Sequence, residues 1–534
     1  MNGLKESAKK HSSLIVLLVI MAVSYAHSMF VNRPWYDELY TYYYFVSRGP
    51  IYAAIHWPVP NNHMGYSVLA GVMDLFGNSY LGLRAVSVIC STINIYLIYR
   101  LVHYINAKYE LMYLACFIGA YMPYSLAFQG RGYALSTTCL LIALNMLMRI
   151  AFGEDKLKFY VIWAVSLAWG LYTIPSSTYW VIPVCLTGGF FLLVTKDHKK
   201  MFKLIIASLA GAVMTFAMYS LVWLAIGSNL LSKETDSAFF GMYQLDVIKT
   251  SPVSAFSRGM QYMLDTPYIQ SIDRKEVITG LFGYFESIFD QFYAYSKSCM
   301  GLAACIVSAL SVIAALGYII GFLRDKEGAK DEEAKREFMS ASIVAVFGIS
   351  IPVMLIVQSV QPYLRVFSFF ALIYGVMVTF LISSIFKLLK KYLKREDKVY
   401  TMAEQGIYFL MFFYAMVAVF IFTWYRPSRI ELADRENDIA DVLNVMDGDA
   451  REIDSIYYTD DFQRFVLKFY YDIEPNETSL EEADYVMLST AFLENSEQSD
   501  WPMLVYYDSF DLDYLDENFV VKGETEKYRI YRRK

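Results

Sequence analysis

Apolar residues along this chain are gathered into long runs that short polar or charged segments separate. The first run extends from about Ser13 to Phe30 and follows three lysines in the first ten residues. A helix that crosses a bilayer needs about 20 predominantly apolar residues. No small-residue cleavage site follows the run, so we interpret it as a retained transmembrane helix rather than a signal peptide. The further runs are Leu81–His103, Leu111–Phe128, Tyr133–Ile150, Phe159–Thr173, Tyr179–Thr195, Leu204–Ile226, Met300–Leu323, Phe338–Val357, Phe367–Phe386 and Met402–Trp424. The pattern predicts a multi-pass α-helical membrane protein with about eleven transmembrane helices.

The pattern changes after Pro427, where the long apolar runs stop and Asp and Glu become dense. Short strand-like stretches follow at Ser455–Tyr458, Tyr485–Leu488, Met503–Tyr507, Phe519–Lys522 and Tyr528–Tyr531, with helical patterns at Arg435–Met446 and Asp461–Tyr470. A segment of about 100 residues is a normal domain size. We therefore expect a transmembrane domain at residues 1–425 and a small α/β domain at residues 426–534.

Composition agrees with a membrane protein. The chain has 534 residues, of which 56% are hydrophobic and only 18% are charged, a charge content low for a soluble protein. The net charge is -6, and no run of Lys and Arg is interleaved with aromatic residues. These two features argue against a nucleic-acid partner.

The distribution of cations predicts the orientation in the membrane. If the N-terminus is cytoplasmic and the spans alternate, every cytoplasmic loop is basic, and the loops contain among others Lys108, Lys156, Lys199, Lys203, Arg324, Lys335, Lys390 and Arg395. The opposite side then holds the loop 31–80, the connector 129–133, the segment 227–298 and everything after Trp424. The small α/β domain is therefore expected to be extracytoplasmic.

Two adjacent carboxylates, Asp37 and Glu38, directly follow the first span among several aromatic residues. At a membrane boundary they could act as a general base or hold a divalent cation. The plainer interpretation is a solvated helix start, because acidic residues are favoured in a first turn and Pro34 suits the first helical position.

Two other predicted extracytoplasmic segments have helical patterns. Ser67–Phe76 is too short to span and could lie in the membrane interface. The second pattern is a stripe at three- and four-residue spacing, formed by Ile278, Leu281, Phe282, Phe285, Ile288, Phe289 and Phe292. This stripe is either an interfacial helix or a cover over the tail of a lipid substrate.

Polar residues that could form a site come from four separate stretches of the chain on the same predicted side. Besides the acidic pair, they are Asn62, His63, Gln129, Arg131, Tyr133, Gln361, Tyr363 and Arg365. Charged residues at this depth usually face a cavity or a partner. Arg365 either extends to lipid headgroups or binds a phosphate, for which a guanidinium has suitable geometry, and Arg131 has the same two interpretations.

Taken together, these motifs resemble the C-type (GT-C) superfamily of integral-membrane glycosyltransferases, in particular its protein O-mannosyltransferase and aminoarabinose lipid A transferase branch. The similar elements are Asp37-Glu38 after the first helix, Asn62-His63, Gln129-x-Arg131-x-Tyr133 and Pro362-Tyr363-x-Arg365. The small domain after the last helix also fits the bacterial members. One departure is His63-Met64, where family members often have His-Pro.

The resemblance implies a transferase in a bacterial inner or plasma membrane that uses a polyprenyl-phosphate sugar as donor and a glycan, lipid or protein as acceptor. Asp37 would be the general base, with Glu38 orienting it or helping to hold a divalent metal ion. Arg131 and Arg365 would stabilise the departing phosphate, and the donor-binding residues would include Asn62, His63, Gln129, Tyr133 and Tyr363.

Three other classes of function remain open at this point. A transporter or flippase of a lipid-linked saccharide would show inverted repeats and helices broken near the midplane, which the sequence does not reveal. A polysaccharide polymerase or ligase would lack an acidic pair directly after the first helix. A scaffold or receptor would leave Asp37 and Glu38 unexplained.

Overall fold

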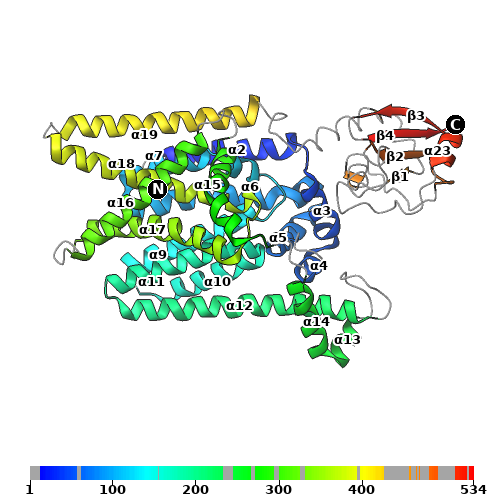
Figure 1. Cartoon of the computed structure of the whole chain (residues 1–534), viewed down its shortest axis with the longest axis horizontal. Coiled ribbons are helices and arrows are strands. Elements are labelled where there is room, and N and C mark those ends of the chain that lie inside the picture. Colours follow the sequence, from blue (N-terminus) through cyan, green and yellow to red (C-terminus); the bar gives the residue numbers. More distant parts are fainter. Residues whose placement is uncertain are drawn as a thin grey trace, which may run out of the picture. The chain divides into compact units, whose positions relative to one another are not determined.

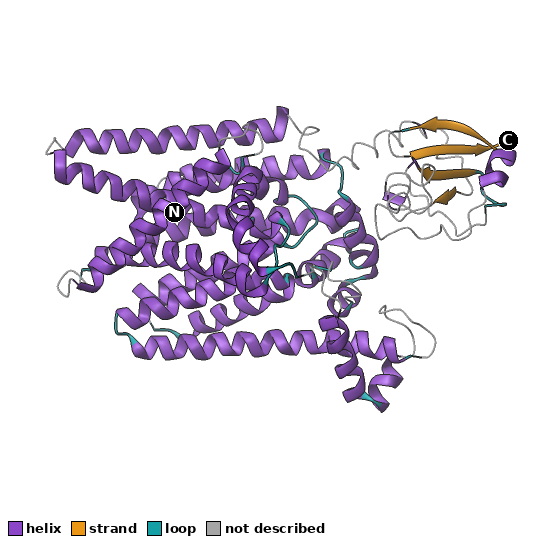
Figure 2. Cartoon of the chain, in the orientation of Figure 1, coloured by secondary structure: helices purple, strands orange, loops and turns teal. Residues whose placement is uncertain are grey.

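The computed structural model describes residues 12–56, 62–153, 155–232, 244–265, 271–293, 300–324, 331–393, 397–425, 480–490, 512–525 and 528–534, together with 445, 456–458, 465 and 468–469. The chain divides into two compact units (Figures 1 and 2). The first contains residues 1–31 and 45–427, and the second contains residues 32–44 and 428–534. The predicted domain boundary at residue 426 lies next to this division, but the segment that carries the acidic pair groups with the C-terminal residues.

The first unit is a bundle of long apolar helices. Within the described residues, nine helices are long and apolar enough to cross a membrane. They are α2 (Ser12–Val31), α6 (Ser79–Asn106), α9 (Tyr133–Phe152), α11 (Thr178–Val194, after the turn η3, Pro175–Ser177), α12 (His198–Leu231), α16 (Met300–Arg324), α17 (Glu332–Gln358), α18 (Phe370–Leu393) and α19 (Asp397–Phe420, continued by η6, Ile421–Tyr425). The predicted fold class, a multi-pass helical membrane protein, is confirmed.

Two of the predicted spans are different in the structure. The run Leu111–Phe128 is divided into α7 (Glu110–Ile118) and α8 (Tyr121–Leu126). The break has a local contribution from Pro123, which lies in the first turn of α8, where a proline is tolerated; in a continuous helix its ring would meet the carbonyl group of Gly119, four residues earlier. The other is α10 (Leu157–Thr173), which forms one helix but has only 17 residues.

Three short elements follow the first span and its polar segment. They are η1 (Val46–Arg48), α4 (Pro50–Ile55) and α5 (Met64–Asp74). The first turn of α5 is buried, and a Cβ atom on Gly65 would lie only 2.6 Å from Thr173 Oγ1 of α10. The predicted interfacial segment is therefore packed into the bundle along its N-terminal part.

The predicted long excursion is mostly helical. α12 has 34 residues and extends over about 51 Å, more than the roughly 30 Å of a hydrocarbon core. After it come α13 (Gln244–Thr250), α14 (Pro252–Asp265) and α15 (Arg274–Phe292). The backbones of α12 and α14 approach each other closely, because a Cβ atom on Gly259 would collide with the Trp223 carbonyl oxygen. Figure 1 shows α13 and α14 beside the end of α12.

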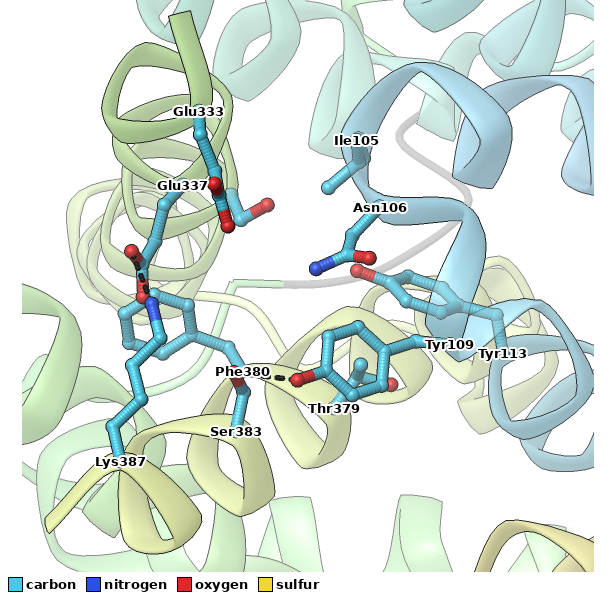
Figure 3. Close-up of a pocket in the computed structure, with 11 residues that line it drawn as sticks. Ile105, Asn106, Tyr109, Tyr113, Glu333, Glu337, Thr379, Phe380, Ser383 and Lys387 are labelled. Carbon is cyan, nitrogen blue, oxygen red and sulfur yellow. Dashed lines mark hydrogen bonds and ion pairs between the residues drawn. The ribbon is translucent and has the colours of Figure 1, made fainter. Parts of the chain in front are cut away.

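A polar cluster connects the last two long helices to the segment after α6. Tyr109 Oη, in η2 (Ala107–Tyr109), is hydrogen-bonded to Ser383 Oγ of α18 at 2.8 Å, a contact seen in Figure 3. The carboxylate of Glu404 in α19 is buried, accepts hydrogen bonds from Tyr109 and Tyr408, and forms an ion pair with Lys108. These contacts link residues almost 300 positions apart in the chain.

The C-terminal part of the second unit contains a four-stranded sheet with the order β1-β2-β4-β3. The strands are β1 (Ile456–Tyr458), β2 (Tyr485–Ser489), β3 (Phe519–Glu524) and β4 (Tyr528–Arg533), with α23 (Leu512–Asn518) before β3. β1 and β2 are parallel, whereas β4 is antiparallel to both β2 and β3. The predicted small α/β domain is thus confirmed; the predicted strand Met503–Tyr507 lies outside the described residues, and α23 was not predicted.

Candidate functional site

The acidic pair lies in α3 (Tyr36–Tyr44), in the second unit. Glu38 is fully buried, and its carboxylate accepts a hydrogen bond of 2.8 Å from the backbone N–H of Trp35, the residue before the helix. This is the acidic half of a capping box. Asp37 is 7% exposed. The pair does begin a helix, but the carboxylates are not solvated, and Pro34 lies before the helix rather than at its first position.

His63 lies directly before α5 and is held by the loop that leads into α9. The backbone N–H of Gly132 donates to Nδ1 at 2.8 Å, and Arg131 Nη2 is 3.2 Å from Nε2. Burial, assisted by the charges of Arg131 and Arg365, holds the pKa of His63 well below its usual value of 6.5. The imidazole is therefore neutral at physiological pH.

The hydrogen bond at Nδ1 determines where the ring carries its proton. A neutral imidazole has one donor and one acceptor nitrogen, so the acceptor role of Nδ1 assigns the proton to Nε2. Nε2–H and the guanidinium of Arg131 are then two donors 3.2 Å apart, which cannot bond to each other. Both can donate to one shared oxygen, which is a geometry suited to an anion.

The loop Gln129–Gly132 is fixed against α6. Ser87 Oγ donates to the Gln129 carbonyl oxygen at 2.5 Å. The loop needs its glycines, since a Cβ atom on Gly132 would lie 2.7 Å from Thr173 Cγ2 and 3.1 Å from His63 Cβ. The guanidinium of Arg131 is therefore carried by a loop that has little freedom to move, and the residue is only 3% exposed.

Arg365 is the second cation of this region. It lies in η5 (Leu364–Phe367), and its Nε donates to Tyr133 Oη at 3.0 Å. Its guanidinium also stacks over the ring of Tyr363, 4.9 Å from the centroid. The His63 and Tyr133 rings are in edge contact with centroids 5.2 Å apart. Four of the predicted donor-binding residues, from three separate segments, are thus joined by direct contacts.

An apolar groove is lined in part by a residue that closely follows η5 in the sequence. It has a volume of about 390 Å³ and is bounded by α15, α16, α17 and α18. Five residues of the predicted stripe on α15 line it, namely Ile278, Leu281, Phe282, Phe285 and Phe289. Phe370, five residues after Arg365, lines it as well, and Tyr284 of α15 donates to the Pro362 carbonyl oxygen. The stripe therefore forms one wall of a groove.

The two predicted amide residues differ in their surroundings. Asn62 donates to the carbonyl oxygens of Ala53 at 3.0 Å and His56 at 2.6 Å, and it accepts from Ser67 Oγ at 2.6 Å. Its donors are used to hold α4 against α5, which is a structural role. Gln129 is also buried, and within the described residues its Oε1 has no hydrogen-bond partner.

Arg84 is a buried cation that sequence reasoning missed. It lies in α6, is fully buried, donates to the Met29 carbonyl oxygen of α2 at 2.7 Å and stacks over Phe128. This contact stabilises the end of the helix that precedes the acidic pair. The available signal was a lone arginine near the start of the predicted span Leu81–His103, where it was counted as part of the span and given no role of its own.

A metal ion was one of the roles considered for the acidic pair. Among the residues that the structure describes, no group of three or more His, Cys, Asp or Glu side chains could hold one. Asp37 and Glu38 alone provide two carboxylates, and one of these accepts a backbone hydrogen bond. A bound metal ion would thus need further ligands.

One family model matches part of the chain. The sequence model of dolichyl-phosphate-mannose-protein mannosyltransferases matches residues 62–223, a range that contains Asn62, His63, Gln129, Arg131 and Tyr133. No curated protein matches the chain.

Several solved structures have a similar course of the chain. ArnT from Cupriavidus metallidurans bound to undecaprenyl phosphate is 13% identical, with a TM-score of 0.45 and coverage of 97% of this chain and 98% of that one. The archaeal oligosaccharyltransferase AglB from Archaeoglobus fulgidus is 14% identical, with a TM-score of 0.44 and coverage of 88% and 61%. The arabinosyltransferase EmbB from Mycobacterium smegmatis is 11% identical, with a TM-score of 0.39 and coverage of 76% and 41%. Similarity at this level assigns no residue a role.

The family match includes two of the four motifs on which the predicted resemblance was based. It confirms the resemblance to the C-type superfamily of integral-membrane glycosyltransferases. Over the matched residues, the chain is thus similar to membrane-embedded glycosyltransferases.

Proposed function

We propose that the protein transfers a sugar from a polyprenyl-phosphate donor to an acceptor hydroxyl on the extracytoplasmic side of the membrane. The observation that carries the proposal is the pair of adjacent donors formed by His63 Nε2 and Arg131. A phosphate oxygen accepts from two such donors, and two nearby guanidinium groups balance its charge.

The donor phosphate binds at His63, Arg131 and Arg365. When the bond between the anomeric carbon and the phosphate oxygen breaks, negative charge grows on the leaving polyprenyl phosphate, where donors held in place before the reaction are most effective. Tyr133 holds the Arg365 guanidinium through the hydrogen bond at Nε. Gln129 Oε1 is an acceptor for a sugar hydroxyl, and Tyr363 and Asn62 support the shape of the site.

The polyprenyl tail occupies the groove beside α15. A ligand with a charged head and a long apolar tail needs a cationic site near an apolar surface; Phe370, which lines the groove, follows Arg365 by five residues, and this supports the placement. Of the two interpretations of the α15 stripe, this proposal favours a cover over the tail of a lipid substrate rather than a simple interfacial helix.

Asp37 acts as the general base. It takes the proton of the acceptor hydroxyl while the acceptor oxygen forms its bond to the anomeric carbon. Glu38 orients this end of α3 through its bond to Trp35. A divalent metal ion at the two carboxylates would supply charge stabilisation for the acceptor oxygen.

The experiment is a transfer assay with the purified chain in lipid nanodiscs. It uses a panel of undecaprenyl- and dolichyl-phosphate sugars, with hexosyl and pentosyl members, and mass spectrometry to detect released polyprenyl phosphate. We expect release from at least one donor and its loss in Asp37→Asn. Binding of polyprenyl phosphate without release from any donor would favour a flippase. Absence of binding in folded protein would refute the proposal.

A further inference from the structure

The helix that carries the acidic pair has two chemically different faces. α3 has only nine residues, too few to form a stable isolated helix. At about 100° per residue, Tyr36, Tyr40, Tyr43 and Tyr44 share one face, because they follow the i, i+4, i+7, i+8 spacing. By the same spacing, Glu38 lies on the opposite side of the helix, and Asp37 lies at the edge of the aromatic face, next to Tyr44. The aromatic face therefore determines the direction in which the carboxylates point.

One side chain from the C-terminal part of the chain occupies the centre of that aromatic face. The ring of Phe465 contacts all four tyrosines, with centroid distances of 5.9 Å to Tyr36, 6.2 Å to Tyr40, 5.4 Å to Tyr43 and 5.7 Å to Tyr44. The contact with Tyr43 is stacked and that with Tyr44 is edge-on. Phe465 is only 2% exposed, so the tyrosine face encloses it.

Two neighbouring residues extend the contact. Lys468 Nζ lies 5.3 Å from the centre of the Tyr43 ring, and Phe469 makes an edge contact with Tyr42 at 6.5 Å. Phe465, Lys468 and Phe469 are spaced three and four residues apart, as on one side of a helical segment. All these contacts lie within the second unit. A residue more than 400 positions away thus provides the apolar support that the short helix lacks.

We infer that Phe465 is a positioning residue for the reaction and that the C-terminal region, through this side chain, sets the orientation of the Asp37 carboxylate. This role rests on the proposed function, in which Asp37 accepts the proton of the acceptor. It assigns the C-terminal region a part in the chemical step. Loss of the ring should lower kcat and leave donor binding at His63, Arg131 and Arg365 unchanged.

The test compares Phe465→Ala with Phe465→Trp and Phe465→Tyr in the full-length protein. A matched control is Phe519→Leu, which alters a buried phenylalanine (3% exposed) in the core of the same C-terminal sheet, away from α3. With the donor found active in the transfer assay, we expect a fall in kcat of the order of 100-fold for Phe465→Ala, because small misplacements of reacting groups have effects of this size. The donor KM should stay within about twofold, and the aromatic variants should recover most of the rate.

A second measurement does not depend on activity. The chain has 8 tryptophans, and the Trp35 resonance in ¹⁹F NMR spectra of 5-fluorotryptophan-labelled protein can be assigned with Trp35→Phe. In Phe465→Ala we expect this resonance to shift or broaden, whereas in Phe519→Leu it should stay in place. An unchanged Trp35 signal, or equal loss of rate in the two variants, would overturn the inference. If no donor supports transfer but the Trp35 signal responds to Phe465 alone, the proposed function fails while the coupling between Phe465 and α3 stands.

Discussion

Arg365 offers the sharpest test of the phosphate site. Replacement by alanine removes a guanidinium that is positioned by the hydrogen bond from its Nε to Tyr133 Oη and by stacking on Tyr363. A hydrogen bond to a charged group contributes about 1.5–3 kcal/mol. Loss of one such bond to the donor phosphate should raise the dissociation constant for undecaprenyl phosphate by about 10- to 150-fold.

Thermal stability in nanodiscs measures this change without knowledge of the sugar. A ligand at 100 times its dissociation constant stabilises the folded protein by about 2.7 kcal/mol, and a 30-fold loss of affinity reduces this to about 0.9 kcal/mol. Arg365→Ala should therefore lose most of the lipid-induced rise in melting temperature.

The control is Tyr133→Phe, which keeps the guanidinium and removes only its tyrosine partner. We expect a smaller loss of affinity than in Arg365→Ala, because the guanidinium that binds the phosphate is kept and only one of the contacts that position it is removed. Equal affinity of wild type and Arg365→Ala for undecaprenyl phosphate would refute the phosphate site and leave Arg365 as a residue that extends to lipid headgroups.

Three further predictions concern the base, the histidine and the loop. Asp37→Asn should abolish transfer while the stabilisation by undecaprenyl phosphate stays at the wild-type level; a fully active variant would exclude Asp37 as the base. The pKa of His63 is depressed in the folded protein, so below about pH 6.5 the unfolded chain binds a proton that the folded protein does not, and stability falls as the pH decreases. Between about pH 7 and pH 5, the melting temperature of His63→Gln should therefore depend less on pH than that of the wild type. Gly132→Ala should destabilise the protein by about 1–3 kcal/mol and weaken lipid binding, because its Cβ atom would meet Thr173 and His63. Gly189→Ala, inside α11 and with nothing within 4 Å of its Cβ position, should not destabilise the protein and should leave lipid binding unchanged in the same thermal assay.

Hydropathy alone predicted most of the first unit, because a span is a local property of about 20 residues. It failed at Leu111–Phe128, where the apolar run continues through the break between α7 and α8, next to Pro123. It also passed over Arg84, whose burial depends on partners in α2 and α8–α9 that no local pattern contains.

The candidate site was predictable to different degrees. The cluster of His63, Arg131, Tyr133 and Arg365 was expected on one side of the membrane, but the tautomer of His63 depends on a backbone N–H that only the fold brings close. The structural role of Asn62 was hidden for the same reason. The four tyrosines of α3 have a visible helical spacing, yet a spacing does not reveal the partner, and Phe465 lies in a different part of the sequence.

Hydrogen bonds through one tyrosine connect α2 with η6, and the position of these two elements in the sequence has a consequence for the order of events during synthesis. Tyr124 Oη bonds to Ser28 of α2 at 3.0 Å and to Thr423 of η6 at 2.6 Å, so the first and last helices share one side chain. The acidic helix follows the former and the C-terminal region follows the latter. At about 5–20 residues per second, roughly 20–80 s pass between translation of Tyr44 and of Phe465. Throughout this interval the tyrosine face of α3 lacks its phenylalanine, so the nascent chain completes its membrane helices before the proposed base can take its final orientation.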